Sequence, residues 1–424
     1  MELKPGYKQT EVGVIPQGWS VKTVFELSRQ IIDYRGRTPR KLGMEWGGGD
    51  IPALSAGNVK MGFIDFNEHC YRGSNALYNR WMTRGDTAKD DVIFTTEAPL
   101  GNVALIPDER KYILSQRIVL LQIDSGQAVS PYIFQFMLSG QFQKMLADYA
   151  SGSTAKGIQR KKFEQLRLPL PPLPEQRAIA EALSDVDGLL GGLDRLIAKK
   201  RELKQAAMQQ LLTGQTRLPG FHGEWEVKTL GEVGVISGSG VDKKCRQDET
   251  PVRLVNYMDA YRRDFIYSEN LEHWVTASRD QLRRCAVQKG DVFFTPSSET
   301  RNDIANSAVA MEDIPDAAYS YHVVRLRLTE PWDLQFRTYA FKTKAFLDQA
   351  ETICDGGGTR YVISQSKFRS LIVRVPPLPE QTAIAAVLSD MDAELAALEE
   401  RREKTRQLKQ GMMQELLTGR TRLV

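Results

Sequence analysis

The sequence is organised around Pro171-Pro172-Leu173-Pro174-Glu175-Gln176, which opens a long helical pattern that ends at Leu211-Leu212-Thr213-Gly214-Gln215-Thr216-Arg217-Leu218. The same opening returns at residues 376–381 and the same ending at residues 416–423. Both are displaced by 205 positions, and 29 of the 48 positions are identical when 171–218 is aligned without gaps to 376–423. The chain therefore contains an internal duplication, and this stretch is the part of it that repeats without gaps.

The repeated stretch predicts one long helix in each copy. Pro174 and Pro379 suit the first helical turn, where a missing N–H group costs nothing, and Glu175 and Glu380 complement the positive end of the helix dipole. Helices that continue to Leu212 and Leu417 would have about 38 residues and a length of about 57 Å. Gly214 and Gly419 are placed as C-terminal stops. Apolar residues recur in alternating steps of four and three, a heptad seam: Ile179, Leu183, Val186, Leu190, Leu193 and Ile197, then Ile384, Leu388, Met391, Leu395 and Leu398.

Helices of this length outrun an ordinary domain, and a seam with a polar outer side needs a partner helix. The two copies are the expected pair, antiparallel and with pseudo-two-fold symmetry; the alternative is a helix packed on its own domain. Arg402, Thr405 and Lys409 interrupt the second seam, which favours a separate protein as the partner of its last third. The expected partner-binding residues are Leu190, Leu193, Leu203, Arg402, Lys409 and Met412.

The regions between the helices echo one another with small changes of displacement. Residues 223–230 resemble 18–24 at 206 positions, residues 289–295 resemble 89–95 at 200, and residues 358–368 resemble 153–163 at 205. Runs at 91–95 and 118–123 predict strands, and 131–149 predicts an amphipathic helix. The fold class is therefore α+β, with two similar domains and two long helices. The expected boundaries are an extended leader at 1–18, domains at 19–170 and 215–375, and helices at 171–214 and 376–424.

The composition is that of a globular protein with a mild positive charge. The 424 residues carry 57 Lys and Arg against 53 Asp and Glu, a net charge of +4, so contact with nucleic acid must come from local patches. No apolar run reaches the roughly 18 to 20 residues of a membrane span, and the first residues show no signal-peptide core. The four cysteines are isolated, which favours a soluble protein of a reducing cytoplasm.

The sequence lacks the motifs of common nucleotide and DNA chemistry. It contains no Gly-x-x-x-x-Gly-Lys-Ser/Thr phosphate loop, no Gly-x-Gly-x-x-Gly after a strand, and no Asp/Asn-Pro-Pro-Tyr/Phe of adenine methyltransferases. The four histidines have no metal-ligand spacing, and His69 beside Cys70 lacks the third group of a nucleophilic site. We therefore predict no catalytic residue, no metal site and no cofactor in this chain.

Cations and aromatic residues alternate in loop-like stretches of both halves. The first basic loop, residues 34–41, holds four cations in eight positions, and the second half has clusters at 243–246 and 257–263. Arg and Lys neutralise phosphates, whereas Arg, Asn and Gln read base edges. A charge run is usually a solvated surface, but its presence in both halves favours DNA binding. The candidates are Arg35, Arg37, Arg40, Lys41, Asn58, Gln116 and Arg117, then Lys243, Lys244, Arg246, Asn256, Tyr261, Arg262, Arg263, Ser297, Ser298, Arg301 and Asn302.

These motifs resemble the DNA specificity subunit (HsdS) of type I restriction-modification systems, over essentially the whole chain. The resemblance rests on the repeated Pro-Pro-Leu-Pro-Glu-Gln opening, the repeated Leu-Leu-Thr-Gly ending, and the Gly-Ser-Thr-x-x-x-Ile stretch at 152–158, which is looser at 357–363. Residues 89–95 and 289–295 resemble the Lys-Gly-Asp strand of these domains, although Asp90 replaces the glycine in the first.

The resemblance implies two target-recognition domains, each reading half of an asymmetric bipartite site in double-stranded DNA, with the helices as a spacer. It implies catalysis by two docked methyltransferase subunits and by restriction subunits, so S-adenosylmethionine, ATP and Mg²⁺ are expected only in these partners. The host is then bacterial or archaeal. The residues expected near DNA by this resemblance are Ser153, Thr154 and Lys156, with their counterparts Gly358, Thr359 and Arg360.

Two other functions stay open at this point. A self-sufficient methyltransferase or nuclease would act on DNA when the purified chain meets S-adenosylmethionine and Mg²⁺. A coiled-coil scaffold without a DNA role would show no salt-dependent retention of DNA, even with its partners bound.

Overall fold

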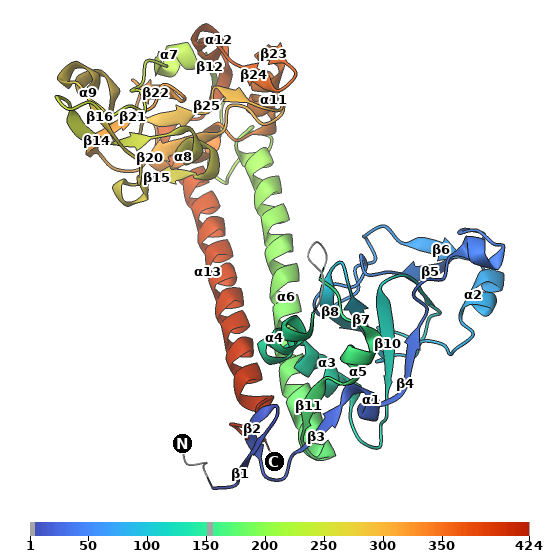
Figure 1. Ribbon diagram of the computed structural model, residues 1–424. Coiled ribbons are helices and arrows are strands. Elements are labelled where there is room, and N and C mark those ends of the chain that lie inside the picture. The colour runs from blue at the N-terminus through green and yellow to red at the C-terminus, as the bar shows by residue number, and fades with distance from the viewer. Residues whose placement is uncertain (1–4, 151–155, 424) are drawn as a thin grey trace. The chain divides into compact units, whose positions relative to one another are not determined.

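The computed structural model describes residues 5–150 and 156–423, and the chain divides into two compact units. Unit 1 consists of residues 1–194 and 401–424, and unit 2 of residues 195–400. Both divisions fall inside the long helices α6 (Leu173–Leu211) and α13 (Leu378–Leu416) (Figure 1). Each unit therefore combines one globular domain with the first part of one long helix and the last part of the other.

The two long helices have the predicted extent to within one residue at each end. Each has 39 residues, and Gly214 and Gly419 follow their ends with φ of +71°, a left-handed conformation that suits glycine. The beginning of each seam is buried against its own domain: Ile179 and Leu183 are 0% exposed, as is Leu388. The predicted pair of long helices is confirmed.

Ion pairs define how the two helices pair inside each unit. In unit 1 Lys409 bonds Asp187 at 2.7 Å, and Arg402 bonds Asp194 at 3.2 Å. In unit 2 Lys204 bonds Asp392, and Lys200 bonds Glu394 at 2.6 Å. Rising residue numbers on one helix meet falling numbers on the other, so the pairing is antiparallel. The Lys409 and Lys204 pairs match one another at the displacement of 205.

The domain of unit 1 has a four-stranded antiparallel sheet, β4-β10-β7-β8, a three-stranded sheet, β6-β5-β9, and the two-stranded pairs β1-β2 and β11-β3. Its elements are β1 (Tyr7–Thr10), β2 (Gly13–Pro16), β3 (Ser20–Thr23), α1 (Val24–Leu27), β4 (Ser28–Asp33), η1 (Pro39–Leu42), β5 (Ile51–Leu54), β6 (Tyr71–Gly73), α2 (Asn75–Trp81), β7 (Val92–Thr96), β8 (Leu100–Leu105), β9 (Ile113–Leu114), β10 (Ile118–Ile123), α3 (Ser130–Leu138), α4 (Gly140–Tyr149), α5 (Arg160–Glu164) and β11 (Arg167–Leu170).

The domain of unit 2 repeats this plan with additions. Its sheets are β13-β22-β18-β20-β15, β16-β14-β21-β17, β19-β24-β23 and β12-β25. Its elements are β12 (Glu226–Thr229), α7 (Leu230–Val233), β13 (Gly234–Ser237), β14 (Thr250–Val255), α8 (Tyr257–Arg262), β15 (Phe265–Ile266), η2 (Ser268–Asn270), β16 (Trp274–Ala277), α9 (Arg279–Cys285), β17 (Ala286–Val287), β18 (Val292–Phe294), β19 (Ser297–Ser298), β20 (Ser307–Ala310), β21 (Ile314–Tyr319), β22 (Val324–Leu328), α10 (Leu334–Ala340), α11 (Lys344–Ile353), β23 (Asp355–Gly357), β24 (Arg360–Val362), α12 (Gln365–Ser370) and β25 (Ile372–Val375).

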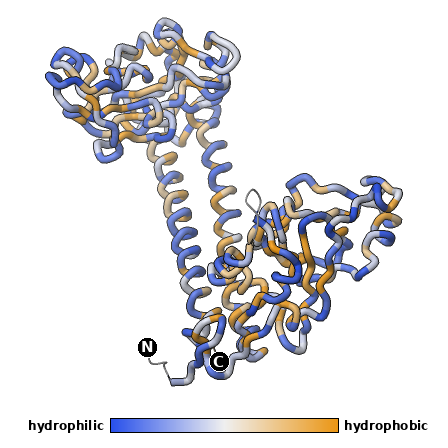
Figure 2. Tube along the Cα trace, viewed as in Figure 1, coloured by the Kyte–Doolittle hydropathy of each residue, from blue (hydrophilic) through white to orange (hydrophobic). Residues whose placement is uncertain are grey.

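The central strands are apolar because both of their faces are buried. In β7, Val92 and Phe94 enter the core shared with α3, α4 and α6, whereas Ile93 enters the core around the second sheet. Strand β18 alternates in the same way, with Phe294 on one side and Phe293 on the other. Figure 2 shows these apolar strands inside each domain. Since a strand buried on both faces has no polar side, its sequence reads as a continuous apolar run.

Two predicted elements differ from the structure. The helix predicted for 131–149 is two helices, because Ser139 has an extended backbone (φ −67°, ψ 148°) and its side chain caps the start of α4. The leader is folded: β1 and β2 form a hairpin that packs on unit 1, where the Tyr7 hydroxyl donates to the Gly419 carbonyl at 3.0 Å. None of the helices that the structure describes contains a stretch long and apolar enough to cross a membrane.

Candidate nucleic-acid interface

Three of the four cations in the first basic loop bond to neighbouring residues. Arg35 donates to both carboxylate oxygens of Asp33 at 2.7 to 3.1 Å, and Arg37 and Lys41 donate to backbone carbonyls. Arg40 is exposed and forms no ion pair within residues 5–150 and 156–423. The loop therefore uses three cations to hold its own shape and leaves Arg40 available for a phosphate.

A surface pocket that Arg40 lines contains aromatic rings, of which Tyr71 and His69 are exposed and Trp46 is half-buried. Trp46 and Tyr71 are stacked at 5.3 Å with an interplanar angle of 12°, and His69 meets Tyr71 edge-on at 4.7 Å. The predicted reader Gln116 lines the same pocket and is exposed. Aromatic faces beside a cation are suited to unstacked bases with their phosphates, and an exposed amide is suited to a base edge.

The other residues of unit 1 that were predicted to contact DNA differ in their exposure. Asn58 is 1% exposed, and its Oδ1 accepts from the backbone N–H of Ser55 at 3.1 Å, so its amide builds a loop and does not face a ligand. Arg117 is exposed, with Nε 3.6 Å from Glu97. Lys156 is exposed and directly precedes Gly157, which forms an isolated bridge with Glu97. Ser153 and Thr154 lie outside the described residues.

In unit 2 the β23-β24 hairpin brings several predicted residues together. Strand β24 pairs with β19 so that Thr359 and Arg360 at the hairpin turn lie near Ser297 and Ser298. These four residues line one pocket with Tyr257, Tyr261, Glu299, Thr300 and Asp303. The two tyrosine rings are stacked at 5.9 Å, and the Tyr261 hydroxyl donates to Asp303 at 2.7 Å. The pocket thus combines aromatic faces, hydroxyls, acceptors and one exposed guanidinium.

A second cationic cluster borders this hairpin. Burial lowers the pKa of His322, and the positive charges of Lys243 and Arg360 lower it further. Both cations are exposed, and the ring of Tyr321 lies 3.9 Å from that of His322. The carboxylate of Asp242 acts in the opposite direction, and the two exposed cations supply the positive charge that a phosphate requires.

The remaining candidates of unit 2 have mixed roles. The Asn256 side chain accepts from the Tyr257 N–H at 2.8 Å and caps α8, so its amide is already engaged. Arg301 donates to the Cys354 carbonyl at 3.2 Å. Arg262 and Asn302 are exposed, while three other cations have acidic neighbours within the domain: Lys244 with Asp242, Arg246 with Glu249, and Arg263 with Asp259.

The expected partner-binding residues fall into two groups. Leu193 is 4% exposed, Leu190 and Met412 are half-buried, and Arg402 and Lys409 form their ion pairs with α6. The interpretation that the last third of α13 uses these two cations for a separate protein is corrected, because both charges are engaged with the neighbouring helix. Leu203 is 48% exposed and remains accessible.

The sequence pattern did not predict a buried cluster of tryptophan, glutamate and arginine in each unit, which we call the lock. The Trp19 indole donates to Glu175 at 2.9 Å, and Arg422 from the end of α13 bonds the same carboxylate at 2.7 Å. Unit 2 repeats this arrangement with Trp225, Glu380 and Arg217: the indole donates at 3.0 Å and the guanidinium at 2.5 and 2.6 Å. The signal was present, since tryptophan, glutamate and arginine all recur in both copies.

Among residues 5–150 and 156–423, no group of three or more His, Cys, Asp or Glu side chains is placed to hold a metal ion. Burial raises the pKa of the Cys70 thiol, and this thiol donates to the Ala53 carbonyl at 3.4 Å. Since a nucleophilic cysteine needs a lowered pKa, the His69-Cys70 pair has the opposite electrostatics.

Comparison with protein families matches the type I restriction modification DNA specificity domain twice, at residues 16–199 and 222–409. The chain belongs to this family. The recurrence of the match agrees with the internal repeat, and it assigns the α+β domains of the two units to target recognition. A specificity subunit is the non-catalytic DNA-recognition component of a restriction-modification complex.

Relatives and solved structures of specificity subunits align along nearly the full length. The putative type I restriction enzyme MjaX specificity subunit of Methanocaldococcus jannaschii is 22% identical over 98% of this chain and 97% of its own. The EcoKI specificity subunit of Escherichia coli is 20% identical over 88% and 82%. The S subunit from M. genitalium has a similar fold, with a TM-score of 0.55, 14% identity and 98% coverage of both chains. A chain from a type I R-M system has a TM-score of 0.60 at 19% identity, with 96% and 99% coverage.

Proposed function

We propose that this specificity subunit recognises a bipartite target in duplex DNA, with one domain for each half. The observation that carries the proposal is a pair of matching scaffolds with unlike pockets. Unit 1 offers Trp46 and Tyr71 beside Arg40, and unit 2 offers Tyr257 and Tyr261 near Arg360. Domains with the same scaffold dock on the DNA backbone in the same way. Pockets with different side chains select different bases, so the two half-sites differ in sequence.

The polar groups of each pocket define the type of readout. The Gln116 amide has the donor and acceptor that adenine requires, and the carboxylates of Glu299 and Asp303 can accept from the amino group of cytosine. Arg40 and Arg360 serve phosphates or guanine. Each bidentate base contact is worth roughly 1 to 3 kcal/mol of discrimination, whereas phosphate contacts give salt-dependent affinity.

The long helices supply the spacer between half-sites and the docking surface for two methyltransferase subunits, to which restriction subunits attach. Helix α6 supports this role because it exposes Leu189 (44%), Leu196 (39%) and Leu203 (48%) at intervals of seven residues. Seven residues are two helical turns, so these leucines share one face of the helix. A repeating exposed apolar face is suited to a partner helix.

Exchange of one domain tests the assignment of half-sites. Replacing residues 19–170 with the corresponding domain of another specificity subunit keeps the β3-β11 pair intact, because both strands are exchanged together. We expect the methylated site to change in one half only, as measured by mapping methylated adenines in a host that carries the hybrid. An exchange of residues 225–375 is the matched control and should change the other half. A change in both halves from one exchange would contradict the proposal.

A further inference from the structure

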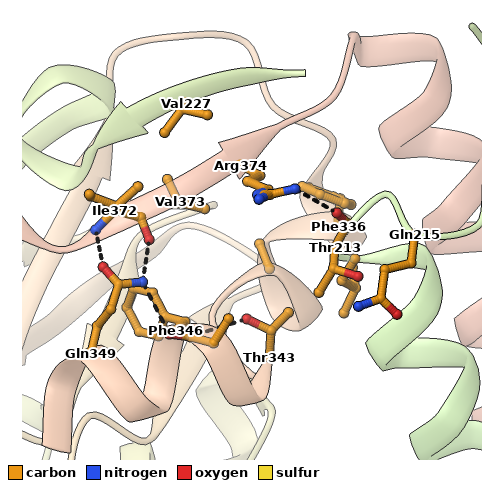
Figure 3. A pocket seen from close by; sticks show the side chains of 13 residues that line it. Thr213, Gln215, Val227, Phe336, Thr343, Phe346, Gln349, Ile372, Val373 and Arg374 are labelled. Atoms are coloured by element: carbon orange, nitrogen blue, oxygen red, sulfur yellow. Dashed lines mark hydrogen bonds between the residues drawn. The ribbon is translucent and has the colours of Figure 1, made fainter. Parts of the chain in front are cut away.

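Unit 2 carries a groove that no described segment of unit 2 fills. It lies where the end of α6 meets β12, β25 and α11, and its lining includes Leu212, Val227, Ala345, Phe346 and Ile372 (Figure 3). Val227 is 64% exposed and Ile372 is 44% exposed. Two exposed aliphatic residues line the rim above a buried phenylalanine. Contact of this apolar surface with water is unfavourable in free energy.

Within this groove the edge of strand β25 is closed at Ile372. The Gln349 amide donates to the Ile372 carbonyl at 3.1 Å and accepts from the Ile372 N–H at 3.0 Å, as Figure 3 shows. This side chain takes the place of a neighbouring strand. An occupant therefore cannot pair with the backbone of Ile372 and contacts this position through its side chains.

The internal repeat identifies the corresponding positions of unit 1. Arg167 pairs with Thr23 in β11-β3 as Ile372 pairs with Thr229 in β25-β12. Gln141 stands two positions after the cap of α4, as Ala345 does after the cap of α11. Arg420 and Gln215 both follow the left-handed glycine that ends a long helix.

In unit 1 these three positions contact the leader hairpin. The Gln141 amide donates to the Val12 carbonyl at 3.1 Å, and Arg167 bonds Glu11 at 2.9 Å. The Tyr7 hydroxyl lies 3.4 Å from the Arg420 carbonyl. Val12 packs against the core of unit 1. The hairpin thus occupies in unit 1 the place that is an open groove in unit 2.

We propose that the groove of unit 2 docks an extended segment of a partner protein that presents an aliphatic side chain as Val12 does in unit 1. Residues 5–150 and 156–423 contain two such places and one leader hairpin, so a second copy that lent its hairpin would empty its own unit 1. The occupant is therefore a different protein. Ile372 replaces Arg167, so the partner carries an apolar residue where the leader carries Glu11. This goes beyond DNA recognition and does not depend on it.

A peptide derived from the leader is the probe. A fluorescent peptide of residues 5–18 with Glu11→Leu is titrated into the full chain, and its anisotropy is measured. We expect saturable binding that Ala345→Trp weakens at least about tenfold, because the exposed helix position places the indole in the groove. Asp348→Trp, exposed on the same helix and outside the groove lining, should leave binding unchanged. Val227→Asp, at a highly exposed position, is a second blocking variant.

Three results would overturn the proposal. The first is absence of saturable binding to the unmodified chain, and the second is equal binding by the Ala345→Trp and Asp348→Trp variants when both keep the melting temperature of the parent. The third is self-association of the chain in sedimentation that Ala345→Trp abolishes, since the occupant would then be a second copy. The peptide with Glu11 retained should bind more weakly, because its carboxylate meets Ile372.

Discussion

Glu175 and Glu380 each join a domain to the end of the other long helix. Both are buried, and each binds one tryptophan of its own domain and one arginine from the segment that follows the other long helix. The sequence pattern predicts only a helix-dipole role for them, because it gives the position of a residue in its own helix. Arg422 is 247 positions from Glu175, and only the folded chain brings the two together.

Neutralising Glu380 is expected to lower the free energy of unfolding. Glu380→Gln keeps the size of the side chain but removes the charge that Arg217 and Trp225 share, at a cost of about 2 to 3 kcal/mol. Calorimetry of the full chain measures the effect. The matched control is Glu403→Gln, whose pair with Arg406 is exposed and should contribute less than about 1 kcal/mol. Equal effects of the two substitutions would show that the lock is not stabilising.

His322 is expected to gain a proton when DNA binds. Its pKa lies below the usual value in the free chain, owing to burial and then to Lys243 and Arg360. Phosphates near these cations would offset their charge and raise the pKa. A group whose pKa rises on binding makes the complex take up protons, so affinity should increase as pH falls through the pKa of this imidazole in the complex toward its lower pKa in the free chain. Nuclear magnetic resonance titration of the imidazole with and without duplex DNA measures both values, and His322→Gln should abolish this part of the pH dependence. An unchanged pKa of His322 would show that His322, Lys243 and Arg360 do not lie at the DNA interface.

Whether a single site residue can be predicted depends on which groups of the protein itself compete for its side chain. Arg40, Gln116 and Arg360 are exposed beside aromatic rings, as their loops suggested. Asn58 and Asn256 are engaged with the backbone. An asparagine amide reads a base edge and caps a turn with the same two atoms, so residue type alone does not separate the two roles.

At the scale of elements, local sequence signals predicted the helix ends and strands that depend on residues close together in the sequence. Proline, glutamate and glycine mark the ends of α6 and α13, and strand β10 coincides with the predicted run at 118–123. The break between α3 and α4 was missed because serine also occurs inside helices, and the periodic pattern does not show that Ser139 caps α4 with an extended backbone. The antiparallel direction of the pair was predicted, but its register was not, since Asp187 and Lys409 are not neighbours in the sequence.

The exposed leucines of α6 are expected to be required for methyltransferase docking. The double substitution Leu196→Asp and Leu203→Asp places two charges on that face within unit 2, and co-purification with the methyltransferase subunit should be lost. Ala198→Asp is the control, because Ala198 is exposed on the opposite side of the same helix. All variants should keep the helical circular dichroism of the parent. Retained co-purification by the double variant would place the docking surface elsewhere.

At the scale of the whole molecule, the helix pair is proposed to set the distance between half-sites. Seven residues inserted after Arg195 in α6, with seven more after Arg401 in α13, preserve the heptad and the opposite pairing. They add about 10 Å of helix, so the unspecified spacer should lengthen by roughly three base pairs at 3.4 Å each. Mapping of methylated sites measures this. An insertion in α6 alone is the control and should reduce stability, because Lys204 would no longer meet Asp392. An unchanged spacer in the double insertion would contradict the spacer role.

The placement of Arg422 in unit 1 has a consequence for synthesis of the chain. Unit 2 is a continuous segment, whereas unit 1 needs residues 401–424. At typical translation rates of roughly 5 to 20 residues per second, the 247 positions from Glu175 to Arg422 take about 12 to 50 s. During that interval the first domain to leave the ribosome lacks its closing segment, while the second can complete itself. A product truncated before Arg422 would thus be most damaged in its first domain.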